Sequence, residues 1–402
     1  MVRTHNKRTM AGMFAAWLVI AAAIVLGSCD SETPVGEAPV IITVSPLRHG
    51  FEGVIYNQVI TAEGTAPIRF TSHGLPAWLT LSAEGVISGT PNGTGEFSFD
   101  ITAYNDYDEY KRSFSVYIKP RHQSIASMQR IQAGSFLMGA PAAEPQSFPN
   151  ERPRHHVTIS SDFYIGRYLV TQRLWTYVMG SNITHPNNQT GIDGLPAYEY
   201  PVTNLSWYHA IVFANRLSIK SGLSPAYNME TTTGTWSVDP DDWGEIPAFN
   251  SARWNNVQIV EGSRGYRLLT EAQWEFAARA GTTTAFSNGT NNYADTAVDE
   301  YGWFVRNSGG TARRVGTRHP NPLGLFDMHG NVQEWLWDRY GSFTNVPQTD
   351  PMGADTGDFR AIRGGCFRCF VHRARSAARR GDVGSYRRAD NLGIRLARPV
   401  DY

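Results

Sequence analysis

The chain has 402 residues, of which 41% are hydrophobic and 12% aromatic, so it can bury the cores of two or three globular domains. Its formal net charge is zero, which argues against nucleic acid or an anionic membrane surface as the partner of the chain as a whole. The chain is rich in glycine, tryptophan and tyrosine, with 38, 11 and 18 residues, and this favours short strands and turns over long helices.

The N-terminus has the features of an export signal. Basic residues precede an uncharged run over residues 9–28 that closes with LGSC at residues 26–29, which resembles the lipobox of bacterial lipoproteins. The resemblance implies a signal peptide over residues 1–28, a lipid anchor on Cys29 and a linker over residues 29–39. The alternative is an uncleaved membrane span, since the run is just long enough to cross ~30 Å of hydrocarbon. Both interpretations predict an exported, membrane-anchored protein facing the periplasm or the cell surface.

Residues 40–120 alternate apolar and polar side chains between Gly, Pro and Asn turns. Period-two runs at this spacing predict a small antiparallel β-sandwich. The stretch GLPAWLTLSAEGVISGTPNGTGEFSFDITAYN resembles the Ig-like, cadherin-related repeats of bacterial surface proteins, with Trp78 and Leu81 as core candidates. The resemblance implies a spacer or adhesive module without catalytic residues.

Residues 125–400 predict a second domain, in which short helices lie among strands and long loops. The clearest helix follows Thr270, which with Gln273 three residues later forms a capping-box pattern. Similar helix starts follow Thr171 and Ser206. These helices, with their Trp and Phe residues, are predicted to be scaffold.

Seven segments of this domain share one family pattern. In chain order they are IQAGSFLMGAP (131–141), ERPRHHVTISSDFYIGRYLVTQ (151–172), YPVTNLSWYHAIVFAN (200–215), YRLLTEAQWEFAARAG (266–281), NPLGLFDMHGNVQEW (321–335), RAIRGG (360–365) and NLGIR (391–395). Together they resemble the sulfatase-modifying factor, or formylglycine-generating enzyme, family across almost the whole domain. The resemblance implies an α+β, C-type-lectin-like fold with much irregular structure, preceded here by the small all-β Ig-like sandwich. It also places the Gly-Gly segment at the functional face.

The resemblance implies two calcium sites. The first maps onto the side chains of Asp327 and Glu334 and the carbonyls of Gly330 and Val332. The second maps onto Asp295, the carbonyl of Thr296, Asn307 and the carbonyl of Gly309. Calcium takes such mixtures of carboxylate and carbonyl oxygens at about 2.4 Å. The alternative is that these carboxylates only hydrogen-bond loop amides.

Oxidases of this family use oxygen and a copper ion held by two cysteines, at the fourth and ninth positions after the Gly-Gly, to convert a sulfatase cysteine to formylglycine. Soft monovalent copper favours such thiolate ligands. Cys369 occupies the fourth position, but the ninth is Ala374. Cys366 stands where the family has serine, and Gln333 where the oxidases have tryptophan. We therefore expect a protein without the complete copper site. The alternative is a copper-dependent formylglycine-generating oxidase using Cys369, with Cys366 as an unorthodox partner.

Cys366 and Cys369 could instead form a disulfide or bind a metal ion together. In an extended strand their Cα atoms would lie ~10 Å apart on opposite faces, too far for a disulfide and poorly placed for a shared metal. Pairing would need a bulge or turn, which the adjacent glycines permit. A single CxxC is half of a zinc signature, with His372 as the candidate third ligand.

The tail after the Gly-Gly is dense in arginine, and many relatives with this fold that lack the cysteine pair act in binding, adhesion or envelope assembly. We therefore predict a ligand-binding face for an acidic protein or a glycan, formed by Phe367, Arg368, His372, Arg373, Tyr386 and Arg387. The alternative, preferred for Arg363, Arg379 and Arg395, is pairing with carboxylates such as Glu271, Glu275 or Glu334. A second hypothesis is a variable protein of a diversity-generating retroelement, whose variable region has about the length of this tail. No nucleic-acid partner is expected.

Overall fold

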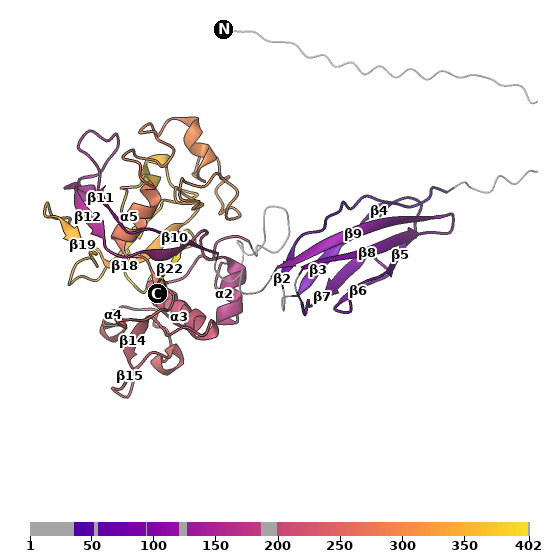
Figure 1. Ribbon diagram of the computed structural model, residues 1–402, viewed down its shortest axis with the longest axis horizontal. Helices are drawn as coiled ribbons and strands as arrows, with labels where there is room; N and C mark the ends of the chain where they lie inside the picture. The colour runs from indigo at the N-terminus through magenta and orange to yellow at the C-terminus, as the bar shows by residue number, and fades with distance from the viewer. Residues whose placement is uncertain (1–35, 52–54, 94, 120–126, 186–198, 401–402) are drawn as a thin grey trace, which may run out of the picture. The chain divides into compact units, whose positions relative to one another are not determined.

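The computed structural model describes residues 36–51, 55–93, 95–119, 127–185 and 199–400 (Figure 1). The chain divides into two compact units, Met1–Ile118 and Lys119–Tyr402. The predicted signal peptide and Cys29 lie outside the described residues. Within the described ranges, no helix has both the length and the hydropathy that a membrane crossing requires.

The first unit is built of strands. They are β1 (Val40–Ile41), β2 (Gly50–Phe51), β3 (Tyr56–Val59), β4 (Ala62–Glu63), β5 (Arg69–His73), β6 (Leu79–Leu81), β7 (Val86–Gly89), β8 (Gly95–Tyr104) and β9 (Glu109–Lys119). One sheet has the order β2-β9-β8-β5 and another the order β3-β7-β6, while β1 pairs with β4. The pairs β1–β4, β3–β7, β5–β8, β6–β7 and β8–β9 are antiparallel.

The core of the first unit follows from the period-two pattern of β8 and β9. Phe99, Ile101 and Ala103 are buried while the residues between them are not, because successive side chains of a strand point to opposite faces. Trp78 and Leu81 are partly buried and pack against this core. The ring of Trp78 meets those of Tyr56 and Phe97 edge-on. The predicted sandwich and its two core candidates are thus found, with the candidates at the border of the core.

The second unit mixes short helices with short strands. Its helices are α2 (Gln172–Met179), α3 (Trp207–Lys220), α4 (Ala252–Asn255) and α5 (Glu271–Arg279), with the 3-10 turns η1 (Pro149–Glu151), η3 (Pro240–Trp243), η4 (Thr296–Glu300) and η5 (Val371–Ala374). Its strands are β10 (Met128–Ile131), β11 (Gly134–Met138), β12 (His155–Ile159), β13 (Phe163–Gly166), β14 (Tyr227–Glu230), β15 (Trp236–Ser237), β16 (Gln258–Ile259), β17 (Arg267–Leu268), β18 (Gln333–Arg339), β19 (Gln348–Thr349), β20 (Arg360–Arg363), β21 (Leu392–Gly393) and β22 (Leu396–Pro399).

The described residues of this unit form four small sheets, with the orders β10-β13-β22-β17, β11-β12-β19, β15-β14-β16 and β20-β18-β21. The pairs β12 with β19 and β18 with β21 are parallel, and the other neighbouring strands of these sheets are antiparallel. The last sheet brings segments far apart in the sequence together, since β18 lies between β20 and β21. This is the mixed α+β architecture with much irregular structure that the sequence predicts.

The predicted helix starts are confirmed. The side chains of Thr171, Ser206 and Thr270 accept hydrogen bonds from the amide three residues later, and Gln273 completes the capping box of α5. Helix α3 lies at the centre of the largest core cluster, and Phe213 stacks on Trp175 with ring centres 4.9 Å apart. Burying each such aromatic side chain stabilises the fold by ~1.5–3 kcal/mol. These helices are therefore scaffold, as predicted.

Candidate functional site

The functional face is set by a sharp turn after strand β20. Gly364 and Gly365 have φ values of 96° and 69°, in the left-handed region that favours glycine. A Cβ atom on Gly365 would lie 2.7 Å from the Cβ atom of Ala374. Glycine has no Cβ atom and so avoids this clash. The chain then folds back on itself, and the amide of Cys369 donates to the carbonyl of Cys366 at 2.9 Å.

This turn joins Cys366 and Cys369 in a disulfide, with their Cα atoms 4.9 Å apart. Of the two conformations that the sequence left open for this segment, the structure has the turn, because β20 ends at Arg363 and the chain does not continue as a strand. Cys366 is buried, and the amide of Asn391 donates to its Sγ atom, while Cys369 is partly exposed.

The disulfide bears on the predicted copper site. The thiolate is the form of cysteine that binds metals and attacks substrates, and both sulfurs are bonded to each other. The position of the second family cysteine is taken by Ala374, which is buried. In this arrangement the residues do not fit a thiolate-bound copper ion.

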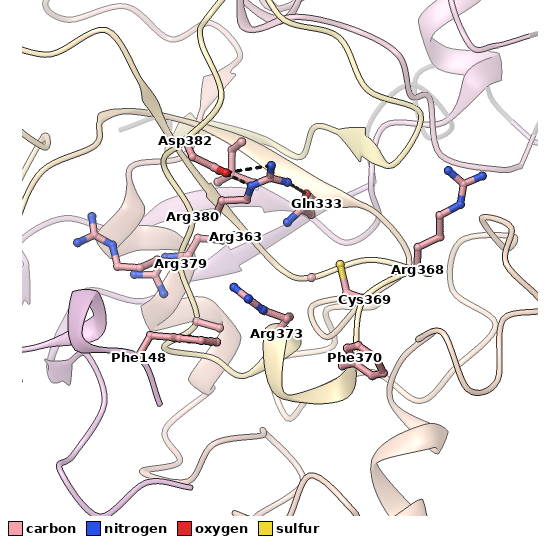
Figure 2. A pocket seen from close by; sticks show the side chains of 13 residues that line it. Phe148, Gln333, Arg363, Arg368, Cys369, Phe370, Arg373, Arg379, Arg380 and Asp382 are labelled. Carbon is pink, nitrogen blue, oxygen red and sulfur yellow. Dashed lines mark hydrogen bonds and ion pairs between the residues drawn. The ribbon is translucent and has the colours of Figure 1, made fainter. Parts of the chain in front are cut away.

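A pocket of about 360 Å³ opens beside the disulfide (Figure 2). We call it the arginine pocket. Its lining residues are Phe148, Gln333, Ile362, Arg363, Gly365, Arg368, Cys369, Phe370, Arg373, Ala378, Arg379, Arg380 and Asp382. Five of them are arginines and one is an acid. The pocket is therefore positively charged wherever an arginine is not paired with an acid.

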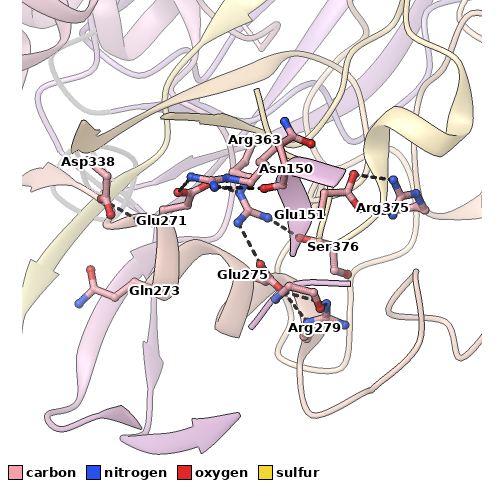
Figure 3. A network of polar contacts seen from close by, with 12 residues as sticks. Asn150, Glu151, Glu271, Gln273, Glu275, Arg279, Asp338, Arg363, Arg375 and Ser376 are labelled. Carbon is pink, nitrogen blue, oxygen red and sulfur yellow. Dashed lines mark hydrogen bonds and ion pairs between the residues drawn. The ribbon is translucent and has the colours of Figure 1, made fainter. Parts of the chain in front are cut away.

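Two of the five arginines belong to a buried ion network (Figure 3). Arg363 donates to Glu271 at 2.8 Å and to Glu275 at 2.9 Å, and Arg379 donates to Glu271 at 2.6 and 2.8 Å. Burial opposes ionisation of Glu271, but the charges of Arg379 and Arg363 outweigh it and hold the pKa of this carboxyl below its ordinary value. The preferred interpretation of these two arginines, pairing with Glu271 and Glu275, is confirmed.

A second set of buried ion pairs, centred on Arg375, lies next to this network. Arg375, which is fully buried, donates to both carboxylate oxygens of Glu151 at 2.7 and 2.8 Å and also pairs with Glu144. Both acids lie more than 200 positions earlier in the chain. These contacts fix the segment around η1, which includes Phe148, against the C-terminal tail.

Two further arginines are paired at the surface. Arg380 pairs with Asp382 and donates to Gln333 at 3.2 Å. Arg368 pairs with Asp390 at 2.6 Å. Such exposed pairs contribute little to stability, and a ligand can displace them.

Arg373 differs from the other four arginines. Among the described residues its side chain forms no hydrogen bond or ion pair, and its guanidinium lies 4.3 Å from the centre of the Phe148 ring. Its side chain is exposed and points toward the pocket in Figure 2. Arg373 makes only the smallest contribution to the lowered pKa of Asp382, which is due first to the hydrogen bond from Arg380. The charge of Arg373 is thus the least compensated in the pocket.

An aromatic rim lies next to Arg373. Phe370 is 67% exposed and its ring stacks on that of His372, with ring centres 6.0 Å apart. His372 also contacts Phe148 at 5.9 Å. Partial burial, and then the charges of Arg373 and Arg375, lower the pKa of His372, so its ring is neutral at pH 7. The site therefore offers apolar surface beside positive charge.

The structure brings together only some of the residues predicted to bind a ligand. Arg368 and Arg373 line the pocket, and His372 borders it. Phe367 is fully buried in a cluster with Leu169 and Val332. The prediction that Phe367 contacts a ligand was therefore wrong, because its ring packs in the core. Tyr386 packs against the large core and carries Arg387 over its ring at 5.0 Å, outside the pocket.

The predicted site residues did not include the lining residues Phe148, Gln333, Ile362, Phe370, Ala378, Arg380 and Asp382. Gln333 carried a signal, because it stands where the family's oxidases have tryptophan. Phe370, Arg380 and Asp382 stand in the arginine-dense tail, whereas Phe148 comes from a distant segment with no signal of its own.

The first predicted calcium site is occupied by protein donors. Arg395 donates to both carboxylate oxygens of Glu334 at 3.1 to 3.2 Å, and the Trp274 indole donates to the same group at 2.9 Å. Arg395 also donates to the carbonyls of Gly166 and Phe326. This confirms the preferred interpretation of Arg395, and its guanidinium supplies the positive charge that Glu334 needs.

Asp327, the other acid of this site, accepts from the amide of Gly316 at 2.8 Å and from Asn331 at 3.2 Å. Burial raises the pKa of Asp327 to about 6. No group of three or more His, Cys, Asp or Glu side chains with metal-binding placement occurs in the described part of the chain. Gly330 and Val332 lie in the same segment, but with both carboxylates satisfied by the protein, calcium at this site stays a prediction.

The second predicted calcium site has the same character. Asp295 caps η4 by accepting from the amide of Ala297 at 2.9 Å, and its carbonyl accepts from Arg306 at 2.9 Å. Asn307 accepts from the amide of Phe304 and donates to the carbonyl of Gly302. Of the other two predicted ligands, Thr296 begins η4, and Gly309 has the guanidinium of Arg313 beside it. This site, too, stays a prediction.

Comparison with known proteins identifies the family. A family model described as sulfatase-modifying factor enzyme 1-like domain matches residues 114–400, and an Ig domain model matches residues 38–119. The chaperone protein LppX of Paenibacillus barcinonensis is 37% identical over 202 residues, which are 46% of this chain and 64% of LppX, just under two thirds of its length. The formylglycine-generating enzyme of Streptomyces coelicolor is 31% identical over 306 residues, covering 70% of this chain and 92% of the enzyme.

Among solved structures, Treponema denticola variable protein 1 matches with a TM-score of 0.60 and 31% identity, covering 75% of this chain and 99% of that protein. This similarity and the family match agree with the C-type-lectin-like fold expected for the second unit, and with the Ig-like fold expected for the first. The chain therefore belongs to the sulfatase-modifying factor enzyme 1-like family, the family of the formylglycine-generating enzymes, with an Ig domain before the family domain.

Proposed function

We propose that this protein is an exported, lipid-anchored binding protein whose arginine pocket captures an anionic group of a protein or glycan ligand. The observation that carries the proposal is the pocket itself, in which Arg373 is exposed and has no acid partner among the described residues. The membrane anchor is the predicted lipid on Cys29. The binding domain would then act at the membrane surface, in ligand binding or envelope assembly.

The chemistry of arginine supports an anionic ligand. A guanidinium offers several N–H donors in one plane, which match the oxygens of a carboxylate or a sulfate. The charges of Arg363 and Arg379 are held by buried acids, so these two side chains shape the pocket. Arg373 is left to contact the ligand, and Arg368 and Arg380 can exchange their surface acids for it. The exposed ring of Phe370 adds apolar contact next to the charge.

The disulfide favours binding over oxidation. An oxidase of this family would need the sulfurs of the pair as thiolates, and here they are bonded to each other. The relatives that are named formylglycine-generating enzymes leave the oxidase as the alternative for this chain. No contact in the arginine pocket supports that alternative.

A second candidate is a variable binding protein of the diversity-generating-retroelement type. It is supported by the match to Treponema denticola variable protein 1, which spans 99% of that protein. The test is to inspect the DNA beside the gene for a near-copy of the codons for residues 366–394 and for a reverse transcriptase. Absence of both removes this candidate and leaves the arginine-pocket proposal unchanged.

The binding proposal is tested with the purified chain and two polyanions, a heparin hexasaccharide and a hexaglutamate peptide, by isothermal titration calorimetry in low-salt buffer. We expect one of them to bind, and the affinity to fall as salt is added. Arg373→Ala should weaken binding by about tenfold or more. Arg387→Ala is the matched control, because Arg387 is also exposed and stacked on a ring but lies outside the pocket. Failure of both probes to bind, or equal losses in the two variants, would contradict the proposal.

A further inference from the structure

A second hollow of about 1150 Å³ lies where β14, α4 and β18 end, and none of its lining residues lines the arginine pocket. We call it the hairpin groove, because residues of the β14–β15 hairpin, among them Glu230 and Gly234, line it. Figure 1 labels the two strands of this hairpin. The lining residues that matter here are Glu230, Asn250, Arg253, Asn255, Arg339 and Asp358. Neither the family resemblance nor the predicted site residues include any of them.

Two arginines brace the walls of the groove. Arg253 donates to the carbonyls of Glu230 at 2.7 Å and Trp243 at 2.8 Å. Arg339 donates to the carbonyls of Gly357 at 2.8 Å and Asn255 at 2.6 Å. Both guanidinium groups are therefore used by the backbone, and they tie the hairpin, α4 and the segment before β20 together. A site held in this way loses little conformational entropy when a ligand binds.

The same walls leave polar groups without partners. Among the described residues, the carboxylates of Glu230 and Asp358 accept no hydrogen bond and form no ion pair, although both line the groove. The side-chain carbonyl of Asn250 accepts from Asn255 at 2.7 Å, and Asn255 is held in turn by Tyr208 at 2.9 Å. This bond orients the Asn250 amide so that its N–H groups stay available. The groove thus presents two carboxylates without partners as acceptors and one oriented amide as a donor.

The charge of the groove favours an uncharged ligand. Its lining includes two acids, Glu230 and Asp358, and two arginines, Arg253 and Arg339, so the formal charges cancel. A hydroxyl group can donate to a carboxylate and accept from an amide N–H at the same time. Neighbouring hydroxyls on a sugar ring meet these requirements, whereas an anion would face two carboxylates.

An exposed aromatic side chain lies opposite Glu230, one of the two acids. Trp236 is directly opposite Glu230 in the register of the hairpin, and such cross-strand partners point to the same face. Its side chain is 43% exposed, and Phe249, which precedes Asn250, is 67% exposed. The flat face of an indole packs well against the C–H groups of a pyranose ring, while the polar groups nearby bind the ring hydroxyls.

We infer that the hairpin groove is a binding site for a neutral oligosaccharide, with a sugar ring over Trp236 and its hydroxyls on Glu230, Asp358 and Asn250. The groove is larger than the ~300–1,000 Å³ of ordinary small-molecule sites, which suits several linked rings. This inference is independent of the anionic ligand proposed for the arginine pocket.

The test uses the purified chain and a panel of neutral hexasaccharides, namely maltohexaose, cellohexaose, xylohexaose, mannohexaose and chitohexaose, in isothermal titration calorimetry. We expect at least one to bind. Trp236→Ala and Asp358→Asn should each weaken that binding by about tenfold or more. Arg373→Ala, in the arginine pocket, should leave it unchanged. Glu230→Gln keeps the shape of the side chain and should reproduce the loss, and near-ultraviolet circular dichroism checks that each variant is folded.

Three results would overturn the inference. The first is that no hexasaccharide of the panel binds to the folded chain. The second is that binding persists at full strength in both Trp236→Ala and Asp358→Asn. The third is that the groove binds a divalent cation instead, seen as heat on titrating CaCl₂ or MgCl₂ alone that Asp358→Asn abolishes while no sugar binds.

Discussion

The Sγ atoms of Cys366 and Cys369 are bonded to each other across a single turn, with the two Cα atoms 4.9 Å apart. The turn carries Arg368 between the two cysteines and places Cys369 in the wall of the arginine pocket. The bond therefore ties the position of pocket side chains to the oxidation state of this pair.

Replacing both cysteines, Cys366→Ser with Cys369→Ser, should loosen this turn. The chain-entropy model gives about 2 kcal/mol of lost stability for so short a loop. Polyanion affinity should fall by about threefold to tenfold, because Arg368 and Arg373 are no longer preorganised. Calorimetric titration of the variant and of the reduced wild type checks this. Two titratable thiols from this pair in the unreduced, denatured protein would contradict the disulfide.

Glu271→Gln should destabilise the second unit strongly. Glu271 neutralises both Arg363 and Arg379, and removal of its charge leaves two buried guanidinium groups undercompensated. Breaking a buried pair in this way costs about 3–5 kcal/mol. Urea unfolding followed by tryptophan fluorescence measures the loss. Glu300→Gln is the matched control, since Glu300 is a largely exposed acid, and it should change the free energy of unfolding by less than about 0.5 kcal/mol.

Asp338 gives a prediction for pH. Burial, and then the charge of Glu271, raise the pKa of Asp338 to about 8. The folded protein therefore holds this proton where the unfolded chain releases it, and the stabilisation present at low pH is lost as pH rises toward the folded pKa. Asp338→Asn removes this dependence. Relative to the wild type, the variant should gain at least about 1 kcal/mol of stability between about pH 5 and pH 8.

Urea denaturation of both proteins across this pH range measures the difference. The Asn side chain can still accept from the amide of Glu271, as Asp338 does at 2.8 Å, so the fold should be kept. A constant difference between the two proteins at every pH would show that Asp338 does not carry the raised pKa.

Removal of calcium should have little effect at the first predicted site. Arg395 already pairs with Glu334, so the charge of this carboxylate is balanced without an ion, and we expect a chelator to shift the melting temperature by less than about 1 °C. Glu334→Gln should lower stability by about 3–5 kcal/mol with or without chelator. Differential scanning calorimetry in EDTA and in millimolar CaCl₂ distinguishes the cases. A rise of several degrees with CaCl₂ would instead favour the calcium prediction.

The lipid anchor is tested at Cys29. Cys29→Ala should abolish labelling by a fatty-acid analogue in cells and move the protein from the membrane fraction to the soluble fraction, if the uncharged run is a cleaved signal. Retention in the membrane without lipid label would support the uncleaved span, which was the alternative for residues 9–28. Immunoblots of fractionated cells measure both outcomes.

Some features of this protein follow from short segments of its sequence. The helix caps at Thr171, Ser206 and Thr270 depend on contacts with the amide three residues later. The strands β8 and β9 follow from the alternation of apolar and polar side chains along one hairpin. The family motifs likewise predicted the partners of Arg363, Arg379 and Arg395. Local rules suffice here because the interacting groups are close in the chain or belong to a known pattern.

The path of the chain after β20 did not follow from local rules. Gly364 and Gly365 permit either a strand or a turn, and the folded chain has the turn that closes the disulfide, with Gly365 packed closely against Ala374. The burial of Phe367 follows from the same turn, since it directs the ring into the cluster with Val332.

The sequence by itself thus determined the two-unit organisation, the family, the helix caps and the arginine-rich character of the tail. Only the tertiary structure decided which arginine lacks an acid partner and where the hairpin groove lies. Arg373 differs from Arg363 because Glu271 and Glu275, about 90 positions earlier, reach one guanidinium and not the other. Compensation of charge depends on distance in space, and the spacing of residues along the chain does not report it.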